Sequence, residues 1–205
     1  MDTYISFQNG GCMPFTLPLR SKAPNFSLQG TDGKQYSLKS FVDFPVLVIF
    51  FTCNHCPYVI ASDETTRKIA LKYKDKGVAF VAINSNTPEL YDEDSFEHMV
   101  ERMKENKFPW VYLVDSTQEV ARAYGALRTP HFFIFDSQRQ LVYCGCELDD
   151  PLHPKETSRN YIDEALKEML AKKPVTTALT NPVGCTVKWK GHYAHWMPED
   201  ACDLV

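Results

Sequence analysis

The sequence predicts an α/β fold in which a central mixed β-sheet is flanked by helices. Residues 46–51 are six consecutive apolar residues, mostly β-branched or aromatic, which is typical of a strand buried on both faces. A helical pattern and a second apolar run at 78–83 follow, and this order indicates a parallel strand pair joined by a right-handed crossover. Apolar runs at 127–136 and 141–144, separated by a short polar turn, add an antiparallel hairpin.

The first part of the chain supplies one edge of that sheet. Residues 1–20 hold two glycines and two prolines with little periodicity, so we expect an extended lead-in. A Gly-Thr-Asp-Gly turn separates the extended segments 23–28 and 35–38, which predicts an N-terminal β-hairpin. The helix after the first buried strand is expected to start near Pro57, where a missing N–H costs little, and to end before Gly77.

The second part continues the alternation of helices and strands. Ser95 is the expected N-cap of an amphipathic helix, which a strand at 111–114 and a short helix at 119–124 follow. After the late hairpin, a last amphipathic helix covers 161–170 and stops before Pro174. We therefore divide the chain into a lead-in (1–20), one α/β domain (21–172) and a C-terminal extension packed on that domain (173–205).

Composition and charge exclude several classes of protein. The 205 residues carry 22 Lys and Arg against 26 Asp and Glu, and the basic residues are scattered, so neither nucleic acid nor an anionic membrane surface is an expected partner. The longest apolar run is far too short to span a bilayer. The N-terminus lacks a basic segment followed by an apolar one, and the seven cysteines, an odd number, fit a reducing compartment. We therefore expect a cytoplasmic protein.

Two cysteines, Cys53 and Cys56, stand where the first buried strand ends and the next helix begins. A sulfur at a helix N-terminus faces unpaired N–H groups and the positive end of the helix dipole, which favour its thiolate. We expect Cys53 to attack a disulfide and Cys56 to resolve the mixed disulfide, leaving a Cys53–Cys56 disulfide. His55 is expected to lower the pKa of Cys53 and to make the oxidised form easier to reduce. Half of a zinc site, or two cysteines that only pack, are the alternatives.

The order of these elements carries a resemblance to a known family. With Cys-Asn-His-Cys after the first buried strand and Thr-Pro before the late hairpin, the chain resembles the thioredoxin fold. The Ala-Pro-Asn-Phe-Ser-Leu opening at 23–28 and the Asp-Gly at 32–33 resemble the redoxin branch, which holds peroxiredoxins and TlpA/ResA-like thiol-disulfide oxidoreductases. The resemblance covers about residues 20–172. The tail at 181–190 is similar to the end of a little-characterised group of thioredoxin-family proteins.

This resemblance implies roles for residues around the cysteines. In the family, the residue matching Pro130 is a cis-proline beside the disulfide, and the residue matching Thr129 offers backbone hydrogen bonds to an extended substrate. A cis X-Pro bond is uncommon, and close approach of a bound thiol is a reason for one. Thr52 and Asn54, which flank Cys53, are also expected to contact substrate. A trans proline at the start of a strand is the alternative.

Three positions depart from the patterns of the family. Leu47 stands where thioredoxins carry a buried acid, so proton transfer to Cys56 has to use water or another side chain. Thr52 replaces the tryptophan that precedes the first cysteine of thioredoxins. Peroxiredoxins need Pro-x-x-x-Thr-x-x-Cys, and here Phe50 takes the place of the threonine and Val46 that of the proline. These residues count against peroxidase activity without excluding it.

The remaining cysteines and a polar loop offer weaker sites. Cys144 and Cys146 end a strand on the same side, where a disulfide between them would be strained, so we expect two unpaired thiols. Cys12 is interpreted as incidental, with a mobile resolving thiol as the alternative. A polar loop explains three residues that are otherwise candidates for a metal or substrate site, namely Asp149, Asp150 and His153.

The tail contains a Cys-x6-His-x2-His-x6-Cys array made of Cys185, His192, His195 and Cys202. These are the ligand types of a tetrahedral zinc site, but the spacing matches no common zinc motif, and a segment packed over the domain explains the array more simply. Cys185 is also a candidate third redox partner for Cys53 and Cys56.

We therefore expect a thiol-disulfide oxidoreductase that works by ping-pong exchange through Cys53 and Cys56, with no cofactor beyond their disulfide and no bound metal. Its expected partners are protein or small-molecule disulfides and an upstream thiol reductant. The alternatives are a thiol-dependent peroxidase that uses Cys53, and a copper- or zinc-binding module that uses both cysteines and a histidine. The sequence leaves the direction of electron flow open.

Overall fold

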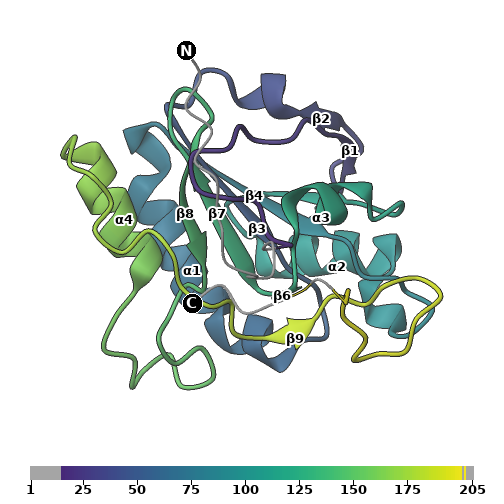
Figure 1. Cartoon of the computed structure of the whole chain (residues 1–205). Coiled ribbons are helices and arrows are strands. Elements are labelled where there is room, and N and C mark those ends of the chain that lie inside the picture. Colours follow the sequence, from purple (N-terminus) through teal and green to yellow (C-terminus); the bar gives the residue numbers. More distant parts are fainter. Residues whose placement is uncertain (1–14, 200, 202–205) are drawn as a thin grey trace, which may run out of the picture.

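A seven-stranded mixed sheet, ordered β2-β1-β5-β4-β3-β7-β8, forms the centre of the computed structural model, which describes residues 15–199 and 201 (Figure 1). Its central strands are β3 (Val46–Phe51) and β4 (Val78–Asn84), which pair in parallel along the length of β3. All thirteen residues of the two strands are buried, the property that the uninterrupted apolar runs predicted. α1 (Pro57–Tyr73) connects these two strands.

Antiparallel hairpins complete both edges of the sheet. At one edge, β1 (Ser27–Gly30) pairs with β2 (Gln35–Ser37) and with β5 (Val111–Val114), and β5 in turn lies parallel to β4. At the other edge, β7 (His131–Phe135) pairs with β3 and with β8 (Leu141–Gly145). The predicted mixed sheet, N-terminal hairpin and late hairpin are therefore confirmed.

Helices cover the two faces of the sheet unequally. Odd-numbered residues of β3, such as Ile49, pack with α3 (Glu119–Tyr124). Even-numbered residues, such as Phe50, belong to the layer that contains α1, α2 (Phe96–Asn106) and α4 (Tyr161–Leu170). Single 3-10 turns follow β2, α1 and the loop after β4, namely η1 (Leu38–Phe41), η2 (Lys74–Lys76) and η3 (Asp92–Asp94). Among the described residues, no helix combines the length and apolar character that crossing a bilayer requires.

Two local predictions need correction. The single strand predicted at 127–136 is divided at Pro130, because β6 (Arg128–Thr129) leaves the main sheet and pairs with β9 (Cys185–Thr186) instead. Ser95 is the N-cap residue of α2, but its hydroxyl bonds the ring of His98 rather than a backbone N–H.

The tail after α4 returns across the domain to the start of α1. The Cys144 backbone on β8 accepts a hydrogen bond from the Thr180 N–H and donates one to the Ala178 carbonyl. Val187 and Trp189 join the apolar core with 1% of their surface exposed. Between these two attachments, β9 lies against β6, at the lower edge of the molecule in Figure 1. The tail therefore ends up beside the cysteines that follow β3.

Candidate active site

Three cysteines from different parts of the chain form one contact group, which we call the thiol cluster: Cys53, Cys56 and Cys185. Cys53 follows β3, Cys56 is the N-cap residue of α1, and Cys185 lies on β9. Cys53 and Cys56 pack together with Val59, and Cys185 packs against them. Cys53 and Cys185 both act on the pKa of the Cys56 thiol, and Cys56 acts on the pKa of each of them. Cys56 is therefore the central member of the cluster.

The three thiols differ in how readily they lose a proton. Hydrogen bonds from Cys185 and Cys53 lower the pKa of Cys56, and the backbone N–H groups of Val59 and Cys185 add to this effect. Burial raises the pKa of Cys53, and the charge of nearby Asp94 adds to the rise. The hydrogen bond to Cys56 raises the pKa of Cys185. Of the three thiols, Cys56 is therefore the one whose surroundings favour the thiolate.

This distribution corrects the expectation for Cys53. The sequence argument placed an ionised, accessible sulfur at position 53, whereas Cys53 is 1% exposed and its pKa is raised. The sulfur at the helix N-terminus is that of Cys56, which is also fully buried. Of the three cysteines, only Cys185 is partly exposed. The position that the helix N-terminus favours for a thiolate is thus occupied by Cys56, the second cysteine of the pair.

The Thr129–Pro130 peptide bond is cis, as the resemblance implied. The Thr129 hydroxyl lies 3.4 Å from the Cys53 sulfur, and the Thr129 carbonyl oxygen lies 3.1 Å from the Cys56 sulfur, from which it accepts a hydrogen bond when Cys56 is protonated. The predicted use of the Thr129 backbone by an extended substrate needs correction, however. Thr129 pairs with Cys185 of β9, so the chain itself occupies this edge.

Asp94 organises the loop between the two cysteines of the pair. Its carboxylate accepts hydrogen bonds from the Asn54 backbone N–H at 2.6 Å, from His55 Nδ1 at 2.7 Å and from the Asn86 amide at 2.8 Å. The His55 ring also stacks on Tyr91, with 3.8 Å between the ring centroids. His55 is thus held by Asp94 and Tyr91, and the predicted lowering of the Cys53 pKa is not observed.

Thr52 and Asn54, the predicted substrate contacts on either side of Cys53, are both buried. The Asn54 side chain donates to the Glu93 carbonyl at 2.6 Å and accepts from the Tyr112 hydroxyl at 2.9 Å. The Thr52 backbone N–H continues the strand pairing by donating to Ile83. Both residues support the loop from within the protein, and their contact with a substrate stays a prediction.

A metal-ligating set exists beside the cluster. Within the described part of the chain, Cys53, His55 and Asp94 are the one group of three Cys, His or acidic side chains whose ligand atoms lie within 4.8 Å of one another. The Asp94 oxygens already accept three hydrogen bonds, and the Cys53 pKa is raised, so the set suits a metal poorly. Cys185, His192 and His195 do not converge with one another or with a fourth ligand among these residues.

The other candidates stay apart from the cluster. Cys144 and Cys146 are buried free thiols, the first facing His131 Nε2 at 3.3 Å and the second the Thr180 hydroxyl at 3.4 Å. Cys12 and Cys202 lie outside the described residues. The His192 ring stacks on Trp196. Asp149, Asp150 and His153 bond within their own exposed loop, as a polar loop predicts.

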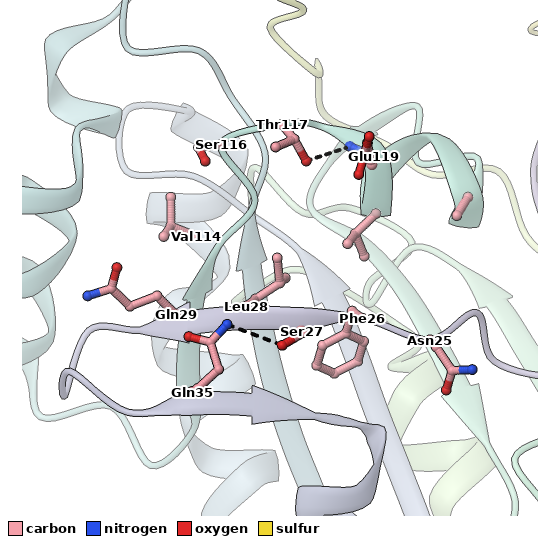
Figure 2. Close-up of a pocket in the computed structure, with 12 residues that line it drawn as sticks. Asn25, Phe26, Ser27, Leu28, Gln29, Gln35, Val114, Ser116, Thr117 and Glu119 are labelled. Atoms are coloured by element: carbon pink, nitrogen blue, oxygen red, sulfur yellow. Dashed lines mark hydrogen bonds between the residues drawn. The ribbon is translucent and has the colours of Figure 1, made fainter.

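A cavity of about 670 Å³ opens elsewhere, between β1, the end of β5 and α3 (Figure 2). Its lining contains no cysteine and no residue that contacts the thiol cluster; Phe26, Leu28, Gln35 and Thr117 are typical members. The volume of a cavity therefore does not identify the candidate active site of this protein.

Sequence reasoning missed four residues of the site. Asp94 and Tyr91 fall in a stretch that looked irregular, although it follows a buried parallel strand, whose carboxyl end is a common place for functional side chains. Gly184 and Lys188 fall in the tail, where no periodic pattern marks a buried segment. The Lys188 ammonium is buried, donates to the Thr186 carbonyl at 2.7 Å and lies over the Tyr91 ring.

Comparison with known proteins identifies the family of this chain. Residues 18–161 match the Redoxin family. Over 105 residues, the chain is 30% identical to the chloroplastic peroxiredoxin Q of Oryza sativa subsp. japonica, covering 51% of this chain and 45% of that protein. Over 121 residues, it is 27% identical to the thiol-disulfide oxidoreductase ResA of Halalkalibacterium halodurans, covering 59% of this chain and 64% of that protein. The chain thus spans about half to two thirds of the length of these curated relatives.

Two solved structures illustrate the fold. A hypothetical protein, SMc02350 from Sinorhizobium meliloti 1021, superposes with a TM-score of 0.81 and 35% identity, over 86% of this chain and 97% of that one. The thioredoxin domain of the thiol-disulfide oxidoreductase BVU-2223 from Bacteroides vulgatus gives a TM-score of 0.56 and 21% identity, over 69% and 97% of the two chains. The second similarity concerns the fold, which is that of thioredoxin.

Proposed function

The chain belongs to the Redoxin family, whose members are oxidoreductases, and we propose that it exchanges disulfides through the Cys53–Cys56 pair. One observation carries the proposal: the two cysteines pack together at the start of α1, each sulfur contacts Thr129 beside the cis-proline, and both thiols are free. Two thiols so close can close into a disulfide after one of them has reacted.

The cycle uses the different acidities of the two thiols. Cys53 attacks a sulfur of the substrate disulfide while its proton passes to the adjacent Cys56 thiolate; the substrate S–S bond breaks, and the first half of the substrate leaves as a thiolate. Cys56 then gives up that proton and attacks the mixed disulfide at Cys53, which releases the second half of the substrate as a thiol. The substrate disulfide is reduced by two electrons, and Cys53 and Cys56 are oxidised to a disulfide.

Burial of the pair supports a small substrate. Cys53 is 1% exposed, and the β6 edge, where a protein segment would add as a strand, already carries β9. We therefore propose a low-molecular-weight disulfide as the substrate class and a thiol as the upstream reductant. The odd number of cysteines favours a reducing compartment such as the cytoplasm.

Reduction of glutathione disulfide or hydroxyethyl disulfide, coupled to a thiol reductant, tests the proposal. We expect Cys53→Ser and Cys56→Ser each to lower the rate at least 100-fold. The matched control is Cys146→Ser, a buried free thiol outside the cluster, which is expected to keep the wild-type rate. A Cys53→Ser protein as active as the wild type would contradict the proposal.

Peroxidase activity is the second candidate, and one contact favours it. The Thr129 hydroxyl lies 3.4 Å from the Cys53 sulfur and supplies a hydroxyl that the Phe50 position lacks. Peroxiredoxin Q is also among the relatives of this chain. Peroxide would oxidise Cys53 to a sulfenic acid, and Cys56 would displace water to form the same disulfide. If peroxide is consumed faster than disulfides under equal conditions, the protein is a peroxidase first.

A further inference from the structure

β9 holds Cys185 at the place that a substrate thiol would take. The strand pairs antiparallel with β6, with Cys185 opposite Thr129, the residue before the cis-proline. Gly184 lies so close to this bend that a Cβ atom there would be 2.7 Å from the Thr129 carbonyl carbon and 3.1 Å from the Pro130 nitrogen. The backbone of the tail therefore packs directly against the Thr129–Pro130 peptide bond. Cys185 packs against Cys53 and Cys56.

Hydrogen bonds on the C-terminal side keep the strand in this position. The Lys188 backbone donates to the Asn86 side chain at 2.8 Å and accepts from the Thr87 N–H at 2.9 Å. Gln118 bonds the tail twice, donating to the Lys188 carbonyl and accepting from the Lys190 N–H, each at 2.8 Å. With Val187 and Trp189 in the core, Cys185 is a fixed member of the cluster rather than a passing contact.

Accessibility separates Cys185 from its two neighbours. Cys53 and Cys56 are 1% and 0% exposed, whereas Cys185 is partly exposed. A thiol reductant in solution therefore meets the Cys185 sulfur before it meets a Cys53–Cys56 disulfide. The interaction with Cys56 is the main reason that the pKa of Cys185 is raised in the reduced cluster, and a Cys56 sulfur held in a disulfide no longer exerts it. The charges of Lys188 and Arg128, which favour the Cys185 thiolate, then remain, and they also attract an anionic thiolate reductant.

We propose that Cys185 is a third redox thiol, which takes over the disulfide from Cys53–Cys56 and presents it to the thiol reductant. This proposal rests on the proposed function for one point, the formation of the Cys53–Cys56 disulfide.

Exchange of the Cys53–Cys56 disulfide for a Cys56–Cys185 disulfide needs no further oxidant. The Cys185 thiolate attacks the Cys56 sulfur, the Cys56–Cys185 bond forms, and the Cys53–Cys56 bond breaks; Cys53 leaves as a thiolate and takes up the proton that Cys185 lost. A reductant thiolate then attacks the exposed Cys185 sulfur and expels Cys56. Its second thiol releases Cys185, so a dithiol is oxidised and the cluster regains three reduced sulfurs. Cys56 is the N-cap residue of α1, where the helix N-terminus stabilises its thiolate as a leaving group.

The first test asks whether Cys56 and Cys185 bond. The full-length Cys53→Ser protein is oxidised with diamide, its free thiols are blocked with N-ethylmaleimide on denaturation, and the disulfides are mapped by mass spectrometry. We expect a Cys56–Cys185 disulfide, with Cys144 and Cys146 alkylated. If Cys56 and Cys185 are recovered alkylated after this treatment, the proposal is overturned.

The second test measures the rate at which dithiothreitol, a dithiol, reduces the oxidised protein. We expect Cys185→Ser to form the Cys53–Cys56 disulfide normally but to be reduced at least tenfold more slowly than the wild type. Cys146→Ser, whose sulfur contacts the same tail at Thr180, is the matched control and should be reduced at the wild-type rate. An unchanged rate in Cys185→Ser would reject the relay and leave the proposed function intact. Absence of any Cys53–Cys56 disulfide in Cys185→Ser would instead reject the proposed function.

Discussion

Replacing Gly184 with alanine should open the thiol cluster. In the native structure, the new methyl carbon would lie 2.7 Å from the Thr129 carbonyl carbon and closer still to the carbonyl oxygen. Favourable carbon–carbon contacts are about 3.5–4.0 Å long, so β9 has to move away from β6 by roughly 1 Å. That movement loosens the strand that covers Cys53 and Cys56 and brings Cys185 to the pair.

The size of the effect follows from the cost of overpacking. A methyl group forced into a filled site typically costs about 1–3 kcal/mol. The clash is relieved when β9 moves away from β6. Most of this energy therefore lowers the free energy of local opening rather than the free energy of global unfolding. A shift of about 2 kcal/mol in the free energy of local opening corresponds to a roughly 30-fold change in the opening equilibrium constant. We therefore expect native-state alkylation of Cys53 and Cys56 to accelerate by roughly 10- to 100-fold.

The assay follows alkylation by iodoacetamide over time at each cysteine-containing peptide. Gly191→Ala is the matched control, since it places the same methyl group in the same tail where no atom lies within 4 Å. Its positive φ of 77° adds some backbone strain, which should leave the cluster covered. If Gly184→Ala and Gly191→Ala alkylate Cys53 and Cys56 at rates within twofold of the wild type, β9 does not seal the pair and the reasoning is refuted.

Three further substitutions test charges in and near the site. Burial raises the pKa of the Glu147 carboxyl to about 7, so the folded state keeps a proton that the unfolded state loses, and stability should fall as pH rises from about 4.5 to 7. The loss should amount to roughly 2–4 kcal/mol and be absent in Glu147→Gln, as measured by urea unfolding at several pH values. Asp94→Asn removes a negative charge beside Cys53 and should shift its alkylation profile to lower pH, measured in a Cys56→Ser background; an unmoved profile would show that this charge has no effect. Lys188→Met removes a positive charge that favours the Cys185 thiolate, so alkylation of Cys185 at pH 8 should slow several-fold. An alkylation rate equal to that of the wild type would show that the Lys188 charge does not act on the Cys185 sulfur.

The regular elements could be predicted because their signals are local. The buried runs of β3 and β4, the proline at the start of α1 and the glycine after α3 each identify an element from a few adjacent residues. The cysteine pair and the cis-proline were found in the same way, since a short motif in its strand-to-helix context identifies them.

The arrangement around the pair depends on contacts between distant residues, which a local pattern does not encode. Asp94 reaches His55 across 39 residues, and Cys185 lies opposite Thr129 across a separation of 56. These contacts decide which sulfur carries the charge and which one reaches solvent. The pair itself is a local motif and its catalytic role stays a prediction, whereas the raised pKa of Cys53 and the lowered pKa of Cys56 depend on these distant contacts.

Disulfide mapping of the wild-type protein tests the central claim most directly. The full-length chain is equilibrated with glutathione redox buffers, blocked with N-ethylmaleimide and digested. Because Cys56 is the sulfur in contact with both Cys53 and Cys185, we predict that every internal disulfide contains Cys56, while Cys144 and Cys146 stay reduced. An internal disulfide without Cys56, or a protein that keeps all its thiols under oxidising buffers, would contradict the account.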